Sequence, residues 1–212
     1  MRYLKWKEEF LNSEVKEKAL GELKKVVLQC KACDLGSTCT NKVFADGNPN
    51  AKIMLIGEAP GAEEDASGVP FVGRAGKLLT QMLNDAGFSR KEDFYIVNTV
   101  KCRPPNNRVP SDFEKKCCSD YLSAQINIVK PKVIVLCGST ALKSFSTKEY
   151  KISDIRGQWI DLFGEIKAMA IFHPSYLLRN HSLEEGSPRD LTKKDLIRIK
   201  TFIEKNCTDK NA

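Results

Sequence analysis

Four cysteines are spaced as ligands of a metal centre. Cys30 and Cys33 form a C-K-A-C pair, and Cys102 and Cys118 follow far downstream. Inside a cell thiols are kept reduced, so cysteines in this pattern indicate metal ligands rather than disulfides. Four thiolates suit an iron-sulfur cluster or a tetrahedral zinc ion. The pattern therefore predicts a metal centre that ties two distant segments together, and it leaves both metals open.

A second set of chemically active residues follows three short apolar runs. The segment G-E-A-P-G (57–61) comes after the first run, Asn98 ends the second, and His173 opens an H-P-S turn after the last. Open α/β sheets bind ligands at the carboxyl ends of their parallel strands, so these groups are expected at one edge. The glycines fit neither a phosphate-binding loop nor a dinucleotide fingerprint, which disfavours a nucleotide cofactor.

The elements that must position these residues alternate between strands and helices. Residues 52–57, 94–98, 132–138 and 169–174 have the apolar composition of short buried strands, and residues 155–167 suggest a hairpin before the last strand. Helical spacing covers residues 15–27, 78–86 and 190–205, and Ser111 with Glu114 forms a capping box that opens another helix. This alternation predicts an α/β protein with a mainly parallel sheet covered on both faces.

Length and charge narrow the class further. At 212 residues the chain suits one domain, expected over 1–212 with a core at about 13–206 and a tail at each end. Its 34 Lys and Arg against 27 Asp and Glu give a net charge of +7, which favours a polyanionic partner. No apolar run approaches the roughly 18 to 20 residues of a membrane helix. We expect an intracellular protein, cytoplasmic or nucleoid-associated, with no membrane partner.

Taken together, the motifs resemble a known family. In order and spacing, G-E-A-P-G, G-V-P-F-V-G-R-A-G, V-N-T-V-K-C-R-P-P-N-N-R and H-P-S-Y-L-L-R are similar to those of the family-four uracil-DNA glycosylases, the iron-sulfur branch, over residues 27–180. The resemblance implies a three-layer α/β/α sandwich with a central four-stranded, mainly parallel sheet. It also implies a monofunctional DNA glycosylase of base excision repair. Such an enzyme flips uracil out of DNA and hydrolyses its N-glycosidic bond, leaving an abasic site and free uracil.

The resemblance also assigns the cysteines. It implies a [4Fe-4S] cluster held by Cys30, Cys33, Cys102 and Cys118, with a structural rather than redox role. Cys117 is the alternative fourth ligand, and Cys118 is preferred because the residues after it keep the family's register.

For the reaction, the resemblance implies one role per motif. His173 would donate a hydrogen bond to uracil O2 as a neutral imidazole, and Asn98 would read the uracil edge through its amide. Phe71 would stack on the base. The implied uracil-binding residues are Gly57, Glu58, Ala59, Glu64, Phe71, Asn98 and His173.

The chain departs from the best-known branch at two positions. The aspartate at the third position of the first motif is Ala59 here, so Glu58 becomes the candidate for positioning water or stabilising the cation, with Glu64 or Asp65 as substitutes. The tyrosine that blocks the methyl group of thymine in that branch is Gly61 here, and Glu64 is the candidate for excluding thymine.

The expected partner is uracil-containing DNA, single- or double-stranded, bound by a monomer. Leucines after the H-P-S turn would hold the space left by the flipped base, and cations would contact phosphates in a salt-sensitive manner. The implied DNA-binding residues are Arg74, Lys101, Arg103, Arg108, Leu177, Leu178 and Arg179. A sliding clamp is a conceivable repair partner, but the sequence shows no motif for one.

Two alternatives compete with this interpretation. A non-catalytic iron-sulfur or zinc protein that binds DNA would keep the cysteines and the basic residues but would not need Asn98, Phe71 and His173 together. A relative that traps uracil covalently would carry an arginine-rich insert with a histidine after Lys101. The chain continues there directly, and its two histidines are His173 and His181, which favours turnover.

Overall fold

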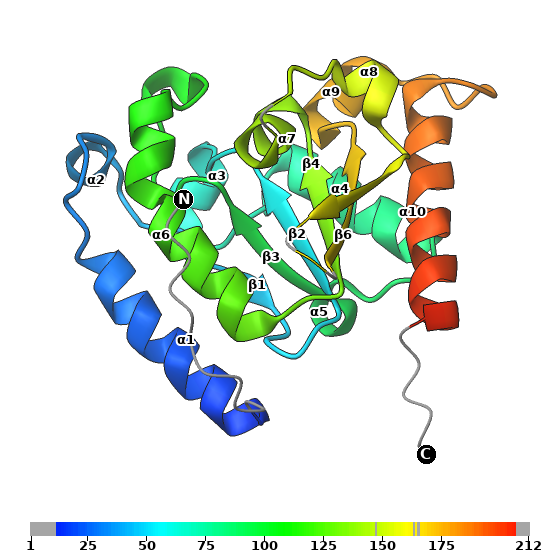
Figure 1. Cartoon of the computed structure of the whole chain (residues 1–212). Helices are drawn as coiled ribbons and strands as arrows, with labels where there is room; N and C mark the ends of the chain where they lie inside the picture. The colour runs from blue at the N-terminus through cyan, green and yellow to red at the C-terminus, as the bar shows by residue number, and fades with distance from the viewer. Residues whose placement is uncertain (1–11, 147, 163, 165, 207–212) are drawn as a thin grey trace.

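A mixed six-stranded sheet forms the centre of the molecule (Figure 1), and its strand order is β1-β3-β2-β4-β6-β5. The computed structural model describes residues 12–146, 148–162, 164 and 166–206, so the expected tails lie almost entirely outside the described residues. The strands are β1 (Asp46–Gly47), β2 (Ile53–Gly57), β3 (Phe94–Asn98), β4 (Val133–Cys137), β5 (Trp159–Leu162) and β6 (Ile166–Ile171).

The four central strands are parallel, as predicted. In β2 and β3 every residue is buried, which is why these strands read as continuous apolar runs. The register pairs Gly57 with Asn98, and it pairs Cys137 with Ile171. The strands therefore end level with one another, and the segments that follow them meet at one edge.

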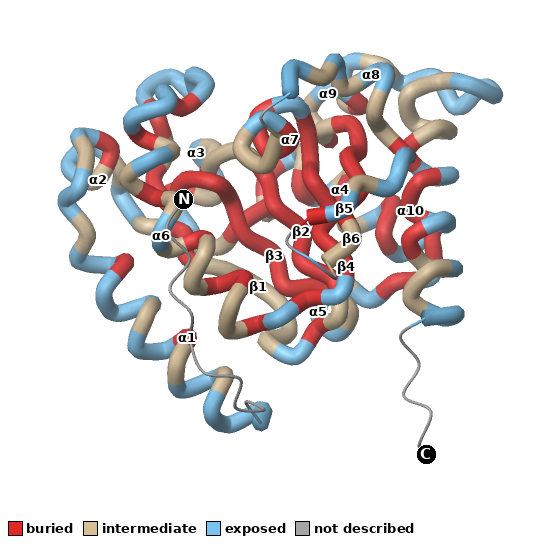
Figure 2. The backbone as a smooth tube through the Cα atoms, viewed as in Figure 1, coloured by how far each residue is buried: buried red, intermediate tan, exposed pale blue. Residues whose placement is uncertain are grey.

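Helices cover both faces of the sheet, so the three-layer arrangement is confirmed. The helical elements are α1 (Ser13–Leu28), α2 (Leu35–Thr38), α3 (Ala62–Ser67), α4 (Arg74–Asp85), α5 (Arg90–Asp93), η1 (Pro105–Asn107), α6 (Asp112–Val129), α7 (Ser139–Phe145), α8 (Ile152–Ile155), α9 (Pro174–Arg179) and α10 (Pro188–Asn206). Ile53 and Leu55 pack with residues of α4, α9 and α10, whereas Met54 and Ile56 pack with residues of α1, α6 and α7. Figure 2 shows the buried sheet between the outer helices.

The predicted capping box explains where α6 begins. Ser111 accepts a hydrogen bond from the Glu114 backbone N–H through its side chain, and the Glu114 carboxylate accepts one from the Ser111 backbone N–H. The capping box thus determines the residue at which α6, the helix that carries Cys118, begins.

The sheet has two more strands than the four predicted, one at each edge and both antiparallel. β5 is the first strand of the expected hairpin, and β6 starts at Ile166, ahead of the predicted residue 169. β1 was not predicted, because its two residues are too few to show an apolar pattern.

In the part of the chain that the structure describes, no helix is long and apolar enough to span a bilayer.

Candidate active site

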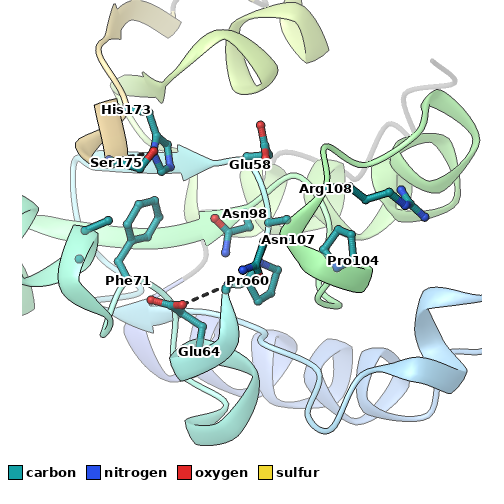
Figure 3. Close-up of a pocket in the computed structure, with 14 residues that line it drawn as sticks. Glu58, Pro60, Glu64, Phe71, Asn98, Pro104, Asn107, Arg108, His173 and Ser175 are labelled. Atoms are coloured by element: carbon teal, nitrogen blue, oxygen red, sulfur yellow. Dashed lines mark hydrogen bonds between the residues drawn. The ribbon is translucent and has the colours of Figure 1, made fainter. Parts of the chain in front are cut away.

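A cavity of about 310 Å³ opens at the carboxyl edge of the sheet. It is lined by the segment after β2, the end of β3, the turn before α4 and the start of α9. Figure 3 shows Asn98, Phe71 and His173 around it. The structure thus brings together the three motifs whose positions in the sequence are far apart.

Asn98 lies at the floor of the cavity and is 2% exposed. Lys101 Nζ donates a hydrogen bond of 2.9 Å to the Asn98 carbonyl, which fixes its backbone. Among the described residues, Asn98 Oδ1 has no hydrogen-bond partner. A buried amide oxygen without a partner carries a desolvation cost, so it marks a position where a ligand donor would be bound.

Phe71 forms one wall of the cavity. Its ring centroid lies 6.0 Å from that of His173, with an angle of 37° between the two planes. A Cβ atom on Gly57 would lie 2.4 Å from Phe71 Cζ and 2.4 Å from Asn98 Oδ1. Only glycine at position 57 therefore allows the ring and the amide to approach each other this closely.

His173 is held in one tautomer. Its Nδ1 accepts a hydrogen bond from the Ser175 backbone N–H at 3.2 Å and lies 2.8 Å from Ser175 Oγ. Burial, with a smaller contribution from the positive charge of Arg179, lowers the pKa of His173 from 6.5 to about 4. The imidazole is therefore neutral at physiological pH, and because Nδ1 accepts, the proton is on Nε2.

Glu58 is fixed by a residue that the sequence motifs did not include. Thr140 Oγ1, on α7, donates a hydrogen bond to Glu58 Oε2. The Glu58 carbonyl accepts hydrogen bonds from Thr99 Oγ1 at 2.6 Å and from the Val100 N–H at 3.3 Å. The segment G-S-T after β4 gave no motif, although its place at the end of a parallel strand could have identified it.

Glu64 joins the two loops that frame the cavity. Its carboxylate accepts hydrogen bonds from the N–H groups of Gly61 at 3.0 Å, Val72 at 2.9 Å and Gly73 at 2.8 Å. Asp65 is bonded elsewhere, to the N–H groups of Thr40 and Asn41, and does not line the cavity. Of the two substitute carboxylates, the structure therefore places Glu64 at the site and Asp65 away from it.

The structure corrects two of the expected DNA contacts. Lys101 is 1% exposed and its ammonium group is bonded to Asn98, so it does not face solvent. Leu177 is 1% exposed and packs in the core between α9 and the sheet, because it lies on the inner side of a short helix. Arg74, Arg108 and Arg179 are exposed, and Arg103 and Leu178 are half-buried.

The four candidate metal ligands come from three segments that meet beside the end of β3. Cys30 and Cys33 lie in the turn after α1, Cys102 follows β3, and Cys118 is on α6. Burial raises the pKa of Cys118, and its neighbours Cys33 and Cys30 raise it further. Cys117 donates a hydrogen bond to the carbonyl of Ala32, which lies between Cys30 and Cys33, at 3.4 Å. Both thiols therefore lie near the first pair, and Cys118 is buried whereas Cys117 is half-buried.

The cysteines supply four sulfur donors from converging segments. Over residues 12–146, 148–162, 164 and 166–206, no three His, Cys, Asp or Glu side chains converge closely enough to hold a single metal. Cysteine thiolates are the ligands that hold iron-sulfur clusters. The observed donor set fits such a cluster in its chemistry and in its four thiols from converging segments.

Comparisons with known proteins agree with this geometry. Residues 44–197 match the family model of the uracil DNA glycosylase superfamily. The chain is 49% identical to the type-4 uracil-DNA glycosylase of Thermotoga maritima, over 84% of this chain and 92% of that protein. It is 42% identical to the type-4 uracil-DNA glycosylase of Archaeoglobus fulgidus (82% and 91%) and 41% identical to that of Sulfurisphaera tokodaii (82% and 83%).

The neutral state of His173 can be tested by titration. We expect its ring proton signals in NMR spectra to shift with a midpoint near pH 4, because burial opposes protonation. Between about pH 6.5 and pH 4 the unfolded chain takes up a proton that the folded chain does not, so this residue should lower the free energy of unfolding as pH falls through that range. With two histidines in the chain, His181→Gln assigns the signals. A midpoint near 6.5 for His173 contradicts the prediction.

Proposed function

The chain belongs to the uracil DNA glycosylase superfamily and acts as a uracil-DNA glycosylase, and we propose that the cavity at the carboxyl edge of the sheet holds the flipped uracil while its bond to the sugar is hydrolysed. One observation carries this assignment. Asn98 Oδ1 is buried without a partner in a cavity that also contains an aromatic ring and a neutral imidazole.

Uracil would be read by the Asn98 amide. Its Oδ1 accepts a hydrogen bond from uracil N3–H and its NH₂ donates to O4. Cytosine presents an acceptor at N3 and a donor at C4, so both bonds would be lost and Asn98 would remain buried and unsatisfied. The bond from Lys101 to the Asn98 carbonyl fixes the main chain from which this amide extends.

The leaving group would be stabilised by His173. Cleavage of the N-glycosidic bond leaves negative charge on uracil, much of it on O2. The Nε2–H of a neutral imidazole is a hydrogen-bond donor that carries no charge before the reaction. It therefore stabilises the anion more than the bound substrate, which is the condition for a faster chemical step.

Water would be positioned by Glu58. Its carboxylate borders the cavity and receives the Thr140 hydroxyl on one oxygen, which leaves lone pairs for a water molecule. A carboxylate in this position also stabilises the positive charge that develops on the sugar. Glu64 has a different role in the proposal: its three backbone hydrogen bonds hold it rigidly against the base, where it excludes the methyl group of thymine.

DNA would lie across the mouth of the cavity. The exposed arginines Arg74, Arg108 and Arg179, with Arg103, would contact phosphates, and Leu178 would press toward the gap left by the base. The proposed partner is single- or double-stranded DNA, bound by a monomer.

We also propose that Cys30, Cys33, Cys102 and Cys118 hold a [4Fe-4S] cluster. When bound, the cluster would supply a covalent link between the turn after α1, the loop after β3 and helix α6. Asn98 lies four residues before Cys102, so this link would hold the loop that continues from the reading amide.

The assignment of His173 predicts a slow variant. Removing one aimed donor typically slows the chemical step by about 10²- to 10³-fold. We expect that loss for His173→Ala in single-turnover cleavage of uracil-containing DNA, with thymine-containing DNA of the same sequence left intact by the unsubstituted protein. His181→Ala is the matched control and should cleave normally. Cleavage by His173→Ala at the rate of the unsubstituted protein contradicts the role, and an unsubstituted protein that leaves no abasic sites contradicts the proposed function.

The Glu58 and Thr140 pair predicts coupled losses. Glu58→Gln should slow single-turnover cleavage by about 10²-fold or more. Thr140→Val, which replaces the hydroxyl by a methyl group, should slow it by about 10- to 100-fold, because hydrogen bonds to charged groups are worth about 1.5 to 3 kcal/mol. Thr140→Ser should cleave nearly normally. In the Glu58→Gln background, Thr140→Val should add little, and additive losses would show that the two side chains act separately.

The ligand assignment predicts a difference between two adjacent cysteines. Purified without oxygen, Cys118→Ser should lose the visible absorbance and the iron of the unsubstituted protein, and it should unfold at a lower temperature. Cys117→Ser should keep both the colour and the iron content. The reverse result assigns Cys117 as the ligand, and zinc in a colourless unsubstituted protein refutes the cluster.

A further inference from the structure

The backbone at Phe71 has a conformation that a residue with a side chain rarely adopts. Its φ is +53°, in the left-handed region. Such a conformation persists only where surrounding contacts fix it, and it is common at ligand sites. The contacts that fix Phe71 therefore determine where its ring stands in the cavity.

Arg90 supplies contacts on one side of this turn. It lies at the start of α5, far from every sequence motif, and its side chain is 12% exposed. Its Nη1 donates a hydrogen bond of 2.8 Å to the Phe71 carbonyl, and its Nη2 donates one of 2.6 Å to the Pro70 carbonyl. One guanidinium group therefore holds two consecutive carbonyls in fixed directions.

The guanidinium group is itself fixed on its other edges. Asp46 Oδ2 accepts hydrogen bonds from Arg90 Nε at 3.1 Å and from Nη2 at 2.9 Å. Thr80 Oγ1, on α4, accepts one from Nη1 at 3.2 Å. A planar group with five donors can meet this set of acceptors at once, whereas a lysine ammonium cannot. Asp46 is half of the two-residue strand β1, so this unpredicted edge strand places the counter-ion of Arg90.

The opposite side of the turn is held by Glu64, which accepts from the N–H groups of Val72 and Gly73. Helix α4 packs directly against the turn at Phe71, since a Cβ on Gly76 would lie 2.0 Å from the Phe71 carbonyl oxygen. The turn is therefore held through its carbonyls by Arg90 and through its N–H groups by Glu64.

We propose that Arg90 is a positioning residue for uracil binding, which holds the Phe71 ring at the angle needed to stack on the flipped base. The inference rests on the proposed function and on the role that the family resemblance implies for Phe71, stacking on uracil. Arg90 does not line the cavity and so acts through Phe71. Its loss should weaken binding of the base more than it slows the chemical step, because His173 and Glu58 stay in place.

The test compares Arg90→Met and Arg90→Lys with the unsubstituted protein. We expect both variants to raise about tenfold the protein concentration that gives the half-maximal rate of single-turnover cleavage. They should raise to the same degree the concentration of free uracil that inhibits cleavage by half. The maximal rate should fall by less than threefold. An unchanged half-maximal concentration in both variants overturns the proposal.

The matched control is Arg156→Met. Like Arg90, Arg156 has a side chain that is 12% exposed, is paired with an aspartate and does not line the cavity. Its partner is the buried Asp195. The substitution Arg156→Met should lower the temperature of unfolding without weakening inhibition by uracil. If Arg156→Met weakens uracil binding as much as Arg90→Met does, the effect of Arg90 is general destabilisation and the proposal is refuted.

A double substitution separates this inference from the proposed function. In the Phe71→Ala background, Arg90→Met should weaken uracil binding no further, because the ring it positions is gone. A further tenfold loss there overturns the role of Arg90. If Phe71→Ala alone binds uracil normally, it is the stacking role of Phe71 in the proposed function that fails. Arg90→Lys keeps the test decisive if Arg90→Met does not fold.

Discussion

Parallel pairing of four buried strands is the constraint on which the rest of the structure depends. Because the pairing is in register, with Gly57 opposite Asn98, the segments that leave the strands must share one edge of the sheet. Three strand ends then contribute different chemical groups to a single cavity: a carboxylate after β2, an amide on β3 and an imidazole after β6. The segment after β4 supplies a hydroxyl, Thr140, that bonds to this carboxylate. A slip of register by two residues would keep the core apolar and still separate the amide from the aromatic ring.

Much of this architecture could be predicted from residue patterns, since the pattern and the structure have the same physical cause. The central strands are apolar because both faces are covered, and the capping box of α6 is a local hydrogen-bonding device. Asn98 and His173 could be placed at the edge because strand ends are predictable from apolar runs. The superfamily match covers the same segments, which is why the motifs were sufficient to identify the family.

Other features could not be predicted, because they depend on contacts between distant residues. Lys101 is a cation among arginines in a polar segment, and only the folded loop shows that its ammonium group is buried against Asn98. Leu177 is buried and Leu178 half-buried, a difference set by which side of α9 meets the core. Thr140 and Arg90 belong to no motif, yet each bonds directly to a residue of the site or its backbone.

The contacts around the cavity share a physical purpose, which is to order the site during folding rather than during binding. Phe71 is held from both sides, Asn98 through its carbonyl, and His173 through Nδ1. A base pulled from a stacked duplex arrives at a cost of a few kcal/mol in lost stacking and pairing, so little binding energy remains for arranging side chains. A cavity whose groups are already fixed does not add that second cost. Among the described residues, Asn98 Oδ1 is then the buried side-chain oxygen left without a partner at the cavity floor. Uracil and thymine both supply the missing donor and the adjacent acceptor, so the exclusion of the methyl group proposed for Glu64 is what separates them.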